Sequence, residues 1–393
     1  MNNIMDYLDW RGDLSFDQDL LNEVDSLILS TLAYIEYDGI VKFQEQDEGV
    51  LLSEIAGKAY DAIDFTAPRC KDPFFEHIPD LLLKAASTRR FGSLTLSYYI
   101  NRINYDNSEQ FSAMVFSLHK KLHYIAFRGT DDNLIGWKED FMMSFLDEVQ
   151  AQRDAVEYTR YLLTMLKGDI YLGGHSKGGN LAVYVAATCE EAKDRLIAVF
   201  NNDGPGFQEK FLESEGYHSV VSKIHTILPK SSVVGMLMEH LEDYVVVNSN
   251  QKGIMQHNAL SWEVLGNHFV YKPGVNKSSI FLNQALRQWL NEVSMEERAE
   301  FVTELFDIID ASGLGTVSSI SSEKRIAVNA MLKAYSNMSP ETKSFMKKLI
   351  YKFIEEAQKV LLQSLEGELH ISRQETGKTI VRRRGKAYIK LQG

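Results

Sequence analysis

Cysteine is scarce in this sequence, and long apolar runs are absent. Cys70 and Cys189 are the two cysteines among 393 residues, too few for a disulfide framework, and their spacing indicates no metal site. No window approaches the roughly 18 consecutive apolar residues that a membrane-spanning helix requires. The first residues, Met1 to Asp6, lack the basic and then apolar pattern of a secretory signal. We therefore expect a cytoplasmic protein without a transmembrane segment or a bound metal.

Positive charge is also in short supply, except near the C-terminal end. The net charge is −12, yet residues 371–393 hold seven lysines and arginines against one glutamate. This segment carries +6 and the rest of the chain −18, which is a poor match for nucleic acid. A basic segment of this kind allows weak contact with an anionic membrane or a phosphate-rich partner. We favour the simpler interpretation, a solvated tail or a small hairpin.

The pattern of apolar residues predicts an α/β architecture. With 45% hydrophobic and 24% charged residues, the chain can bury a large core. Helical spacing covers residues 16–36, 50–63 and 150–167. Segments typical of strands cover residues 93–99, 111–118, 122–127, 170–172, 196–201, 222–228 and 244–248, with a hairpin turn between the second and third. Strands that alternate with helices predict a mainly parallel sheet covered on both faces.

From about Lys277 onward the apolar spacing becomes helical throughout. Ser294 and Glu297 have the spacing of a capping box, and Ser339-Pro340-Glu341 is a second helix start. The Gly- and Ser-rich residues 311–322 separate two helical blocks, and neither block has catalytic spacing. We therefore divide the chain into an α/β part (residues 1–275, helical to about residue 90), a helical region (276–370) and the basic tail (371–393).

The sequence Gly174-His175-Ser176-Lys177-Gly178 is a G-x-S-x-G motif placed between a strand and a helix expected over about 180–192. In such an elbow the serine occupies a strained turn, and side chains at 174 and 178 would collide with the neighbouring strand and helix. The N–H groups that begin the helix face the place where an oxyanion would develop. Ser176 is therefore the candidate nucleophile.

An oxyanion hole needs two donors, usually the N–H after the nucleophile and one from a loop that follows an earlier strand. Lys177 supplies the first through its backbone. For the second, the strand that ends at Phe127 runs into a glycine-containing loop 46 residues before Ser176. This placement makes Thr130 the leading candidate.

These two segments resemble the class 3, or fungal-type, lipases. The similarity lies in Phe127-Arg128-Gly129-Thr130, the later Trp137 and Asp140, and the Gly-His-Ser-x-Gly-Gly elbow, and it is continuous over about residues 111–206. With its opening residues 7–13 and its helical C-terminal region, the whole chain resembles a bacterial family of lipase-like proteins of unknown function. The resemblance implies an α/β-hydrolase fold, ester hydrolysis, no cofactor, an oxyanion donor at Thr130 and the nucleophile at Ser176.

One departure concerns the loop after Thr130. Gly136 stands where these lipases usually have an acid before the tryptophan. We expect Arg128 and Asp140 to form a buried pair that braces the loop, a structural role rather than a catalytic one.

The acid of a catalytic triad should follow the serine in the chain. In class 3 lipases it usually comes after the second strand past the elbow, but here residues 228–233 contain no carboxylate. Asp203 lies one strand earlier, in a Gly/Pro turn at the carboxyl end of a strand, where active groups of open α/β sheets gather. Some lipases outside class 3 carry their acid after this strand. We choose Asp203, with Glu239 and Asp243 as fallbacks, and a simple turn-stabilising role as its alternative.

The base should follow the acid, and His370 is set aside because it lies at the far end of the helical region. Five of the ten histidines remain: His218, His225, His240, His257 and His268. His257 lies in residues 253–258, a loop beyond the strand 244–248, where the last histidine of this fold belongs. We choose His257 as the base and keep His240 and His268 as alternatives.

Met236, Leu237 and Met238 lie close together before these residues. Flexible apolar side chains suit a pocket wall or lid for an acyl chain, and they suit ordinary core equally well. The leading hypothesis is a serine hydrolase that acts on an ester or thioester with an apolar acyl group, such as a lipid. The alternative is a catalytically silent α/β-hydrolase scaffold that binds a partner, motivated by the missing carboxylate after the second strand.

Overall fold

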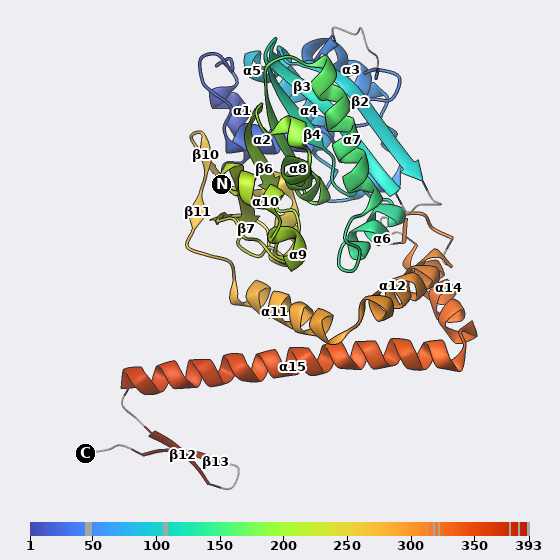
Figure 1. Cartoon of the computed structure of the whole chain (residues 1–393), viewed down its shortest axis with the longest axis vertical. Coiled ribbons are helices and arrows are strands. Elements are labelled where there is room, and N and C mark those ends of the chain that lie inside the picture. The colour runs from blue at the N-terminus through green and yellow to red at the C-terminus, as the bar shows by residue number, and fades with distance from the viewer. Residues whose placement is uncertain are drawn as a thin grey trace.

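A computed structural model describes residues 1–43, 49–104, 109–311, 313–316, 319–320, 323–376, 379–383 and 386–390. This part of the chain holds a nine-stranded sheet in the order β1-β2-β3-β4-β5-β6-β7-β8-β11 (Figure 1). The strands are β1 (Val50–Leu51), β2 (Thr95–Asn104), β3 (Glu109–His119), β4 (Leu122–Phe127), β5 (Asp169–His175), β6 (Leu196–Asn202), β7 (Ile224–Pro229), β8 (Tyr244–Val247) and β11 (Tyr271–Lys272).

The centre of the sheet is parallel and its two edges are antiparallel. Strands β4 to β8 pair in parallel. At one edge β1, β2, β3 and β4 pair antiparallel in that order, and at the other edge β11 pairs antiparallel with β8. The predicted α/β class and the predicted β3–β4 hairpin are confirmed. Because β4, β5 and β6 end in register, with Phe127 beside Gly174 and His175 beside Asn202, the loops after these strands share one edge.

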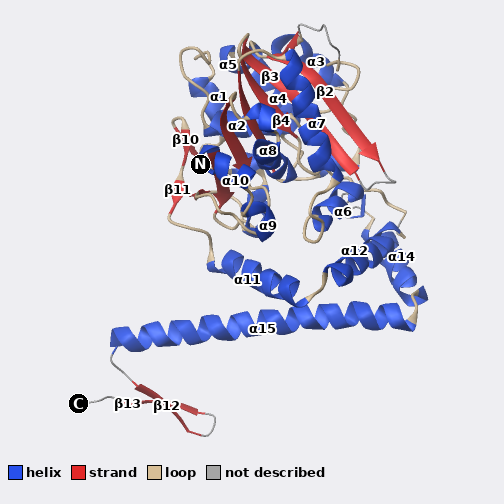
Figure 2. Ribbon diagram, viewed as in Figure 1, coloured by secondary structure: helices blue, strands red, loops and turns tan. Residues whose placement is uncertain are grey.

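Helices cover both faces of the sheet (Figure 2). Helices α7 (Gln150–Met165) and α8 (Lys177–Thr188) cover one face, and α2 (Glu23–Leu32) contacts β4, β5 and β6 on the other. Neighbouring residues of β4 therefore enter different cores, Tyr124 on the α2 side and Ile125 on the α8 side. Burial on both faces explains why the central strands are apolar runs without alternation.

The N-terminal segment is helical but more broken than predicted. Its helices are α1 (Ile4–Arg11), α2, α3 (Leu52–Asp61), α4 (Ile78–Ser87) and α5 (Arg89–Gly92), with a short 3-10 helix at Pro68–Lys71. Helical spacing predicts one helix over residues 16–36, whereas α2 covers Glu23–Leu32. Asn22 caps this helix with Asp25 in a capping box, so the residues before it form turns instead.

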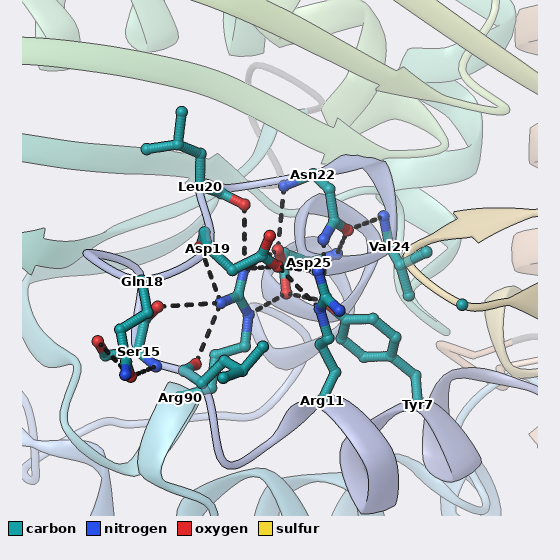
Figure 3. A network of polar contacts seen from close by, with 12 residues as sticks. Tyr7, Arg11, Ser15, Gln18, Asp19, Leu20, Asn22, Val24, Asp25 and Arg90 are labelled. Carbon is teal, nitrogen blue, oxygen red and sulfur yellow. Dashed lines mark hydrogen bonds and ion pairs between the residues drawn. The ribbon is translucent and has the colours of Figure 1, made fainter.

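A buried arginine on α5 joins this helix to α2 and to the residues before α2 (Figure 3). Arg90 and Asp25 have fully buried side chains and form a two-bond ion pair at 2.5 and 2.8 Å. Arg90 also donates to the carbonyls of Asp19 and Leu20, and its guanidinium lies over the ring of Phe16. Each charge is therefore matched, which a buried ion requires.

Replacing Arg90 with methionine should lower the free energy of unfolding by about 3–5 kcal/mol, since it leaves Asp25 buried without a countercharge. Urea unfolding followed by circular dichroism measures the change. Arg89 is exposed and directly precedes Arg90, so Arg89→Met is the matched control, with an effect within about 0.5 kcal/mol. Equal unfolding midpoints for the two variants would contradict this account of the pair.

The C-terminal region is helical, as predicted. It holds α11 (Lys277–Glu292), α12 (Met295–Asp310), α14 (Lys324–Asn337) and α15 (Pro340–Thr376), and the capping box at Ser294 and Glu297 is present. Figure 2 shows these helices on one side of the α/β part, with α15 lying along α11. Strands β12 (Thr379–Arg383) and β13 (Lys386–Lys390) then form a hairpin.

Helix α15 passes through position 371, so the basic segment begins inside a helix rather than after one. The division into three domains stays a prediction. None of the helices in the described ranges is long and apolar enough to cross a bilayer.

Candidate active site

Ser176 occupies the sharp turn between β5 and α8. Its backbone lies at φ 58° and ψ −134°, a region that a residue with a side chain rarely adopts, and its N–H donates to the carbonyl of Asn202 at 2.9 Å. A Cβ at Gly178 would lie 2.0 Å from the carbonyl oxygen of Phe127, and one at Gly174 would lie 2.2 Å from Gly178. The two glycines are therefore steric requirements of the turn.

Helix α8 begins at Lys177, three residues before the predicted start near 180. Glycine has a low helix propensity, so Gly178 and Gly179 obscured the first turn in the sequence pattern. The early start puts the first N–H groups of α8 directly after Ser176, as anion binding at a helix N-terminus requires.

Asp203 follows β6 at the same edge of the sheet. It is completely buried, has a positive φ of 54°, and its N–H donates to the carbonyl of Ile227 at 2.9 Å. Its two carboxylate oxygens have different partners. Ser232 Oγ donates to Oδ1 at 2.5 Å, and Nδ1 of His257 contacts Oδ2 at 2.6 Å.

His257 ends the 3-10 helix Gly253–His257, in the loop after β8. Its carbonyl oxygen accepts a hydrogen bond from Nε2 of His175 at 2.8 Å, and the two imidazole rings lie 4.5 Å apart. Because His175 directly precedes Ser176, this contact holds the His257 loop at the elbow. Nδ1–H faces a carboxylate, so Nε2 is the nitrogen left with a lone pair.

His175 itself is a neutral residue. Burial holds its pKa well below the usual histidine value, with the nearby His257 acting in the same direction. Its Nε2–H donates to His257, and its Nδ1 is 3.2 Å from the hydroxyl of Tyr34. Its place inside the elbow excludes His175 as the triad base, and its contact with the His257 carbonyl makes it a support for the His257 loop.

The alternative bases have other partners. His240 contacts Glu242 through Nδ1 at 3.0 Å and the carbonyl of Gly235 through Nε2 at 2.7 Å. Both ring nitrogens of His240 therefore already have partners within its own loop. The other alternative, His268, has its Nδ1 2.8 Å from the Phe269 carbonyl.

The fallback acids lie apart from the His257 contact. Glu239 forms an ion pair with Arg287, and Asp243 is exposed.

The loop after β4 lies against the elbow. A Cβ at Gly129 would lie 3.0 Å from Cβ of Ser176 and 2.2 Å from the Tyr34 hydroxyl, so only glycine fits there. Thr130 comes next, and its hydroxyl donates to Oδ2 of Asp140, on α6 (Leu134–Met142), at 2.6 Å. The structure therefore brings the predicted oxyanion loop beside Ser176.

A family model described as Mbeg1-like matches residues 85–307. The chain belongs to the Mbeg1-like family. No curated protein matches its sequence.

Three solved structures of lipases are similar to this chain. A fungal lipase–inhibitor complex is 17% identical, with a TM-score of 0.35, over 57% of this chain and 76% of that one. A triacylglycerol lipase whose title describes a serine protease triad is 15% identical, with a TM-score of 0.35, over 57% and 78%. The Rhizomucor miehei lipase propeptide complex is 17% identical, with a TM-score of 0.30, over 43% and 65%.

The predicted buried pair of Arg128 and Asp140 is wrong. Arg128 forms its ion pair with Asp131 at 3.1 Å and donates to Asn101 on β2 at 2.9 Å. Asp140 instead faces Thr130 and Lys177, because α6 packs on β3 next to the elbow whereas Arg128 extends toward β2.

The side chain of Lys177 is a functional candidate that sequence analysis missed. It is buried and forms an ion pair with Glu139 at 2.9 Å. A lysine in the first turn of a buried helix signals that some carboxylate must neutralise it, but the sequence does not indicate which one.

The predicted pocket residues separate in the structure. Met238 has a positive φ of 60° and lines a cavity of about 170 Å³ with Met143, Leu146 and Phe207. The carbonyl of Met236 accepts a hydrogen bond from Asn283, and that of Leu237 accepts one from Gly206. Substrate contact by Met236, Leu237 and Met238 stays a prediction.

Proposed function

We propose that this chain is a serine hydrolase that cleaves a carboxylic ester or thioester through an acyl-enzyme on Ser176. The observation that carries the proposal is the 2.6 Å contact between His257 and the buried Asp203, made at the elbow that holds Ser176. A hydroxyl becomes an effective nucleophile when a base removes its proton and a third group orients that base.

The chemistry follows the order of these contacts. Nε2 of His257 takes the proton of Ser176 Oγ as the oxygen forms a bond to the carbonyl carbon of the substrate. The carbonyl oxygen becomes an oxyanion, and the N–H groups of Lys177 and Thr130 stabilise it. The tetrahedral species then expels the alcohol or thiol, which receives the proton from His257. Water repeats these steps on the acyl-enzyme and releases the acid.

Asp203 orients His257 and stabilises the imidazolium that forms. Ser232 donates to Oδ1 of Asp203, and His257 contacts Oδ2, so each carboxylate oxygen has its own partner. Neutral His175 adds no competing positive charge beside the base.

The substrate that this proposal favours has an apolar acyl group. Met236, Leu237 and Met238 supply half-buried, adaptable side chains on the loop that follows Ser232, next to Asp203. The solved structures that resemble this chain include a triacylglycerol lipase, which is consistent with a small acyl ester or lipid.

Labelling with a fluorophosphonate probe tests the proposal. We expect a stoichiometric adduct on the wild-type chain, located at Ser176 by mass spectrometry, and none on Ser176→Ala. Ser231→Ala is the matched control, since this serine lies in the loop after β7 and donates to no carboxylate in the contacts of the described residues. An unreactive wild-type chain that is folded would favour the silent scaffold instead.

A further inference from the structure

A buried cation lies directly beside the proposed nucleophile. Lys177 is the first residue of α8, yet only 1% of its side chain is exposed. A lysine here is unfavourable on two counts, because the helix N-terminus repels positive charge and because burial removes the hydration of the ammonium group. An apolar side chain would avoid both costs.

Three acceptors surround this ammonium group, and they come from two other elements. Nζ donates to Oε2 of Glu139 on α6 at 2.9 Å, and to the carbonyl and side-chain oxygens of Gln110 on β3 at 3.1 and 3.4 Å. Glu139 is equally buried and accepts two further hydrogen bonds, from the N–H groups of Gln110 and Ala151. The ion pair therefore joins the starts of β3, α7 and α8 to helix α6.

The next residue on α6, Asp140, extends this connection to the loop after β4. Its Oδ2 accepts from the hydroxyl of Thr130, and its buried Oδ1 lies 3.8 Å from Nζ of Lys177. Within the described residues Oδ1 has no hydrogen-bond partner, so the ammonium of Lys177 is the charge that it faces.

We propose that the side chain of Lys177 is a positioning residue of the oxyanion hole. Through Glu139 and Asp140 it fixes the Thr130 loop relative to the elbow. The distance between the two oxyanion donors, the N–H groups of Lys177 and Thr130, therefore stays constant. The inference rests on the proposed serine hydrolase function. Lys177 thus has two roles in the site. Its backbone N–H is an oxyanion donor, and its side chain positions the Thr130 loop through Glu139 and Asp140.

The ammonium group of Lys177 also affects the protonation of Asp140. Burial raises the pKa of Asp140 to about 6, and the positive charge of Lys177 opposes this rise. The other charged or titratable groups near Asp140 are Glu139 on its own helix, His257, and Tyr34. Activity that depends on ionised Asp140 should fall as the pH drops through about 6, and loss of Lys177 should move that fall to higher pH.

Lys177→Met tests the proposal with p-nitrophenyl butyrate as substrate. We expect kcat to fall about 100-fold, comparable to the loss of an oxyanion donor, while KM stays within about twofold. The acid limb of the pH profile should shift upward, and Lys177→Arg should restore part of kcat. Asp140→Asn removes the titrating group, so Lys177→Met should cause no upward shift in that background.

Two further variants separate positioning from stability. Arg90→Met breaks a buried ion pair outside the site, so it should lower stability while leaving kcat and the pH profile of the folded protein unchanged. Should Lys177→Met fail to fold, Lys177→Met/Glu139→Gln removes both charges and takes its place.

The outcomes are distinct. A wild-type chain without Ser176-dependent labelling or turnover overturns the proposed function. An active wild type, together with a folded Lys177 variant of unchanged kcat and pH profile, overturns the positioning role alone.

Discussion

Replacing His257 with alanine is expected to lower kcat for ester hydrolysis by about 10⁶-fold, the size of effect that loss of a triad base produces. The reason is that Nε2 of His257 is the group proposed to remove the Ser176 proton and to return it to the leaving group. Steady-state hydrolysis of p-nitrophenyl butyrate measures the change. KM should vary much less than kcat, since His257 acts in the transition state.

His268→Ala is the control for this prediction. His268 was an alternative base by chain order, and its Nδ1 lies 2.8 Å from the backbone carbonyl of Phe269. Activity should stay within about twofold of the wild type. Loss of activity in His268→Ala with retention in His257→Ala would show that the base has been assigned to the wrong residue.

Replacing Asp203 with asparagine should lower kcat by about 10⁴-fold. The substitution keeps size and shape, but an amide NH₂ facing Nδ1 of His257 would favour the tautomer that carries its proton on Nε2. In that tautomer Nε2 has no lone pair, so it cannot accept the Ser176 proton. The same hydrolysis assay measures the loss, and a circular dichroism spectrum checks that the buried site has kept its fold.

Glu239→Gln and Asp243→Asn serve as matched controls, because each removes one carboxylate charge at a fallback position. Glu239 pairs with Arg287 and Asp243 is exposed, so neither change should lower kcat by more than about twofold. A normal rate in Asp203→Asn combined with a lost rate in Glu239→Gln would move the acid to Glu239.

Much of this arrangement could be predicted because it depends on local geometry and chain order. The elbow at Ser176 requires small residues at fixed positions, and parallel strands must end at one edge of the sheet. Asp203 and His257 each follow a strand of that sheet, so topology alone brings their loops together. The contact between them is what the structure adds.

Contacts between distant polar side chains could not be predicted in the same way. Four acids lie near Arg128 in the sequence, Asp131, Asp132, Glu139 and Asp140, and which of them pairs with it depends on the way α6 packs. The partner of Lys177 is 38 residues away, on a helix whose orientation no local pattern fixes. Pairing of buried charges follows tertiary packing, so it emerges only with the fold.

Local propensity misled at two helix boundaries for a related reason. The apolar spacing of residues 16–36 suggests one helix, but the capping box of Asn22 and Asp25 starts it late. Helix α8, in contrast, begins earlier than predicted. Two glycines lower the helix propensity of its first turn, and the strained backbone of Ser176 fixes that turn. In both places a single side-chain or backbone contact outweighed the average preference of the segment.

The hydrogen bond from Ser232 to Asp203 bears on how inactive relatives are recognised. Ser232 lies after β7, where class 3 lipases usually have their acid, and it donates to the carboxylate that sits after β6 instead. The two positions, on loops after the neighbouring strands β6 and β7, thus meet at one carboxylate. A screen that labels a chain a pseudoenzyme because one alignment column lacks an acid would discard this protein, although a carboxylate contacts its histidine.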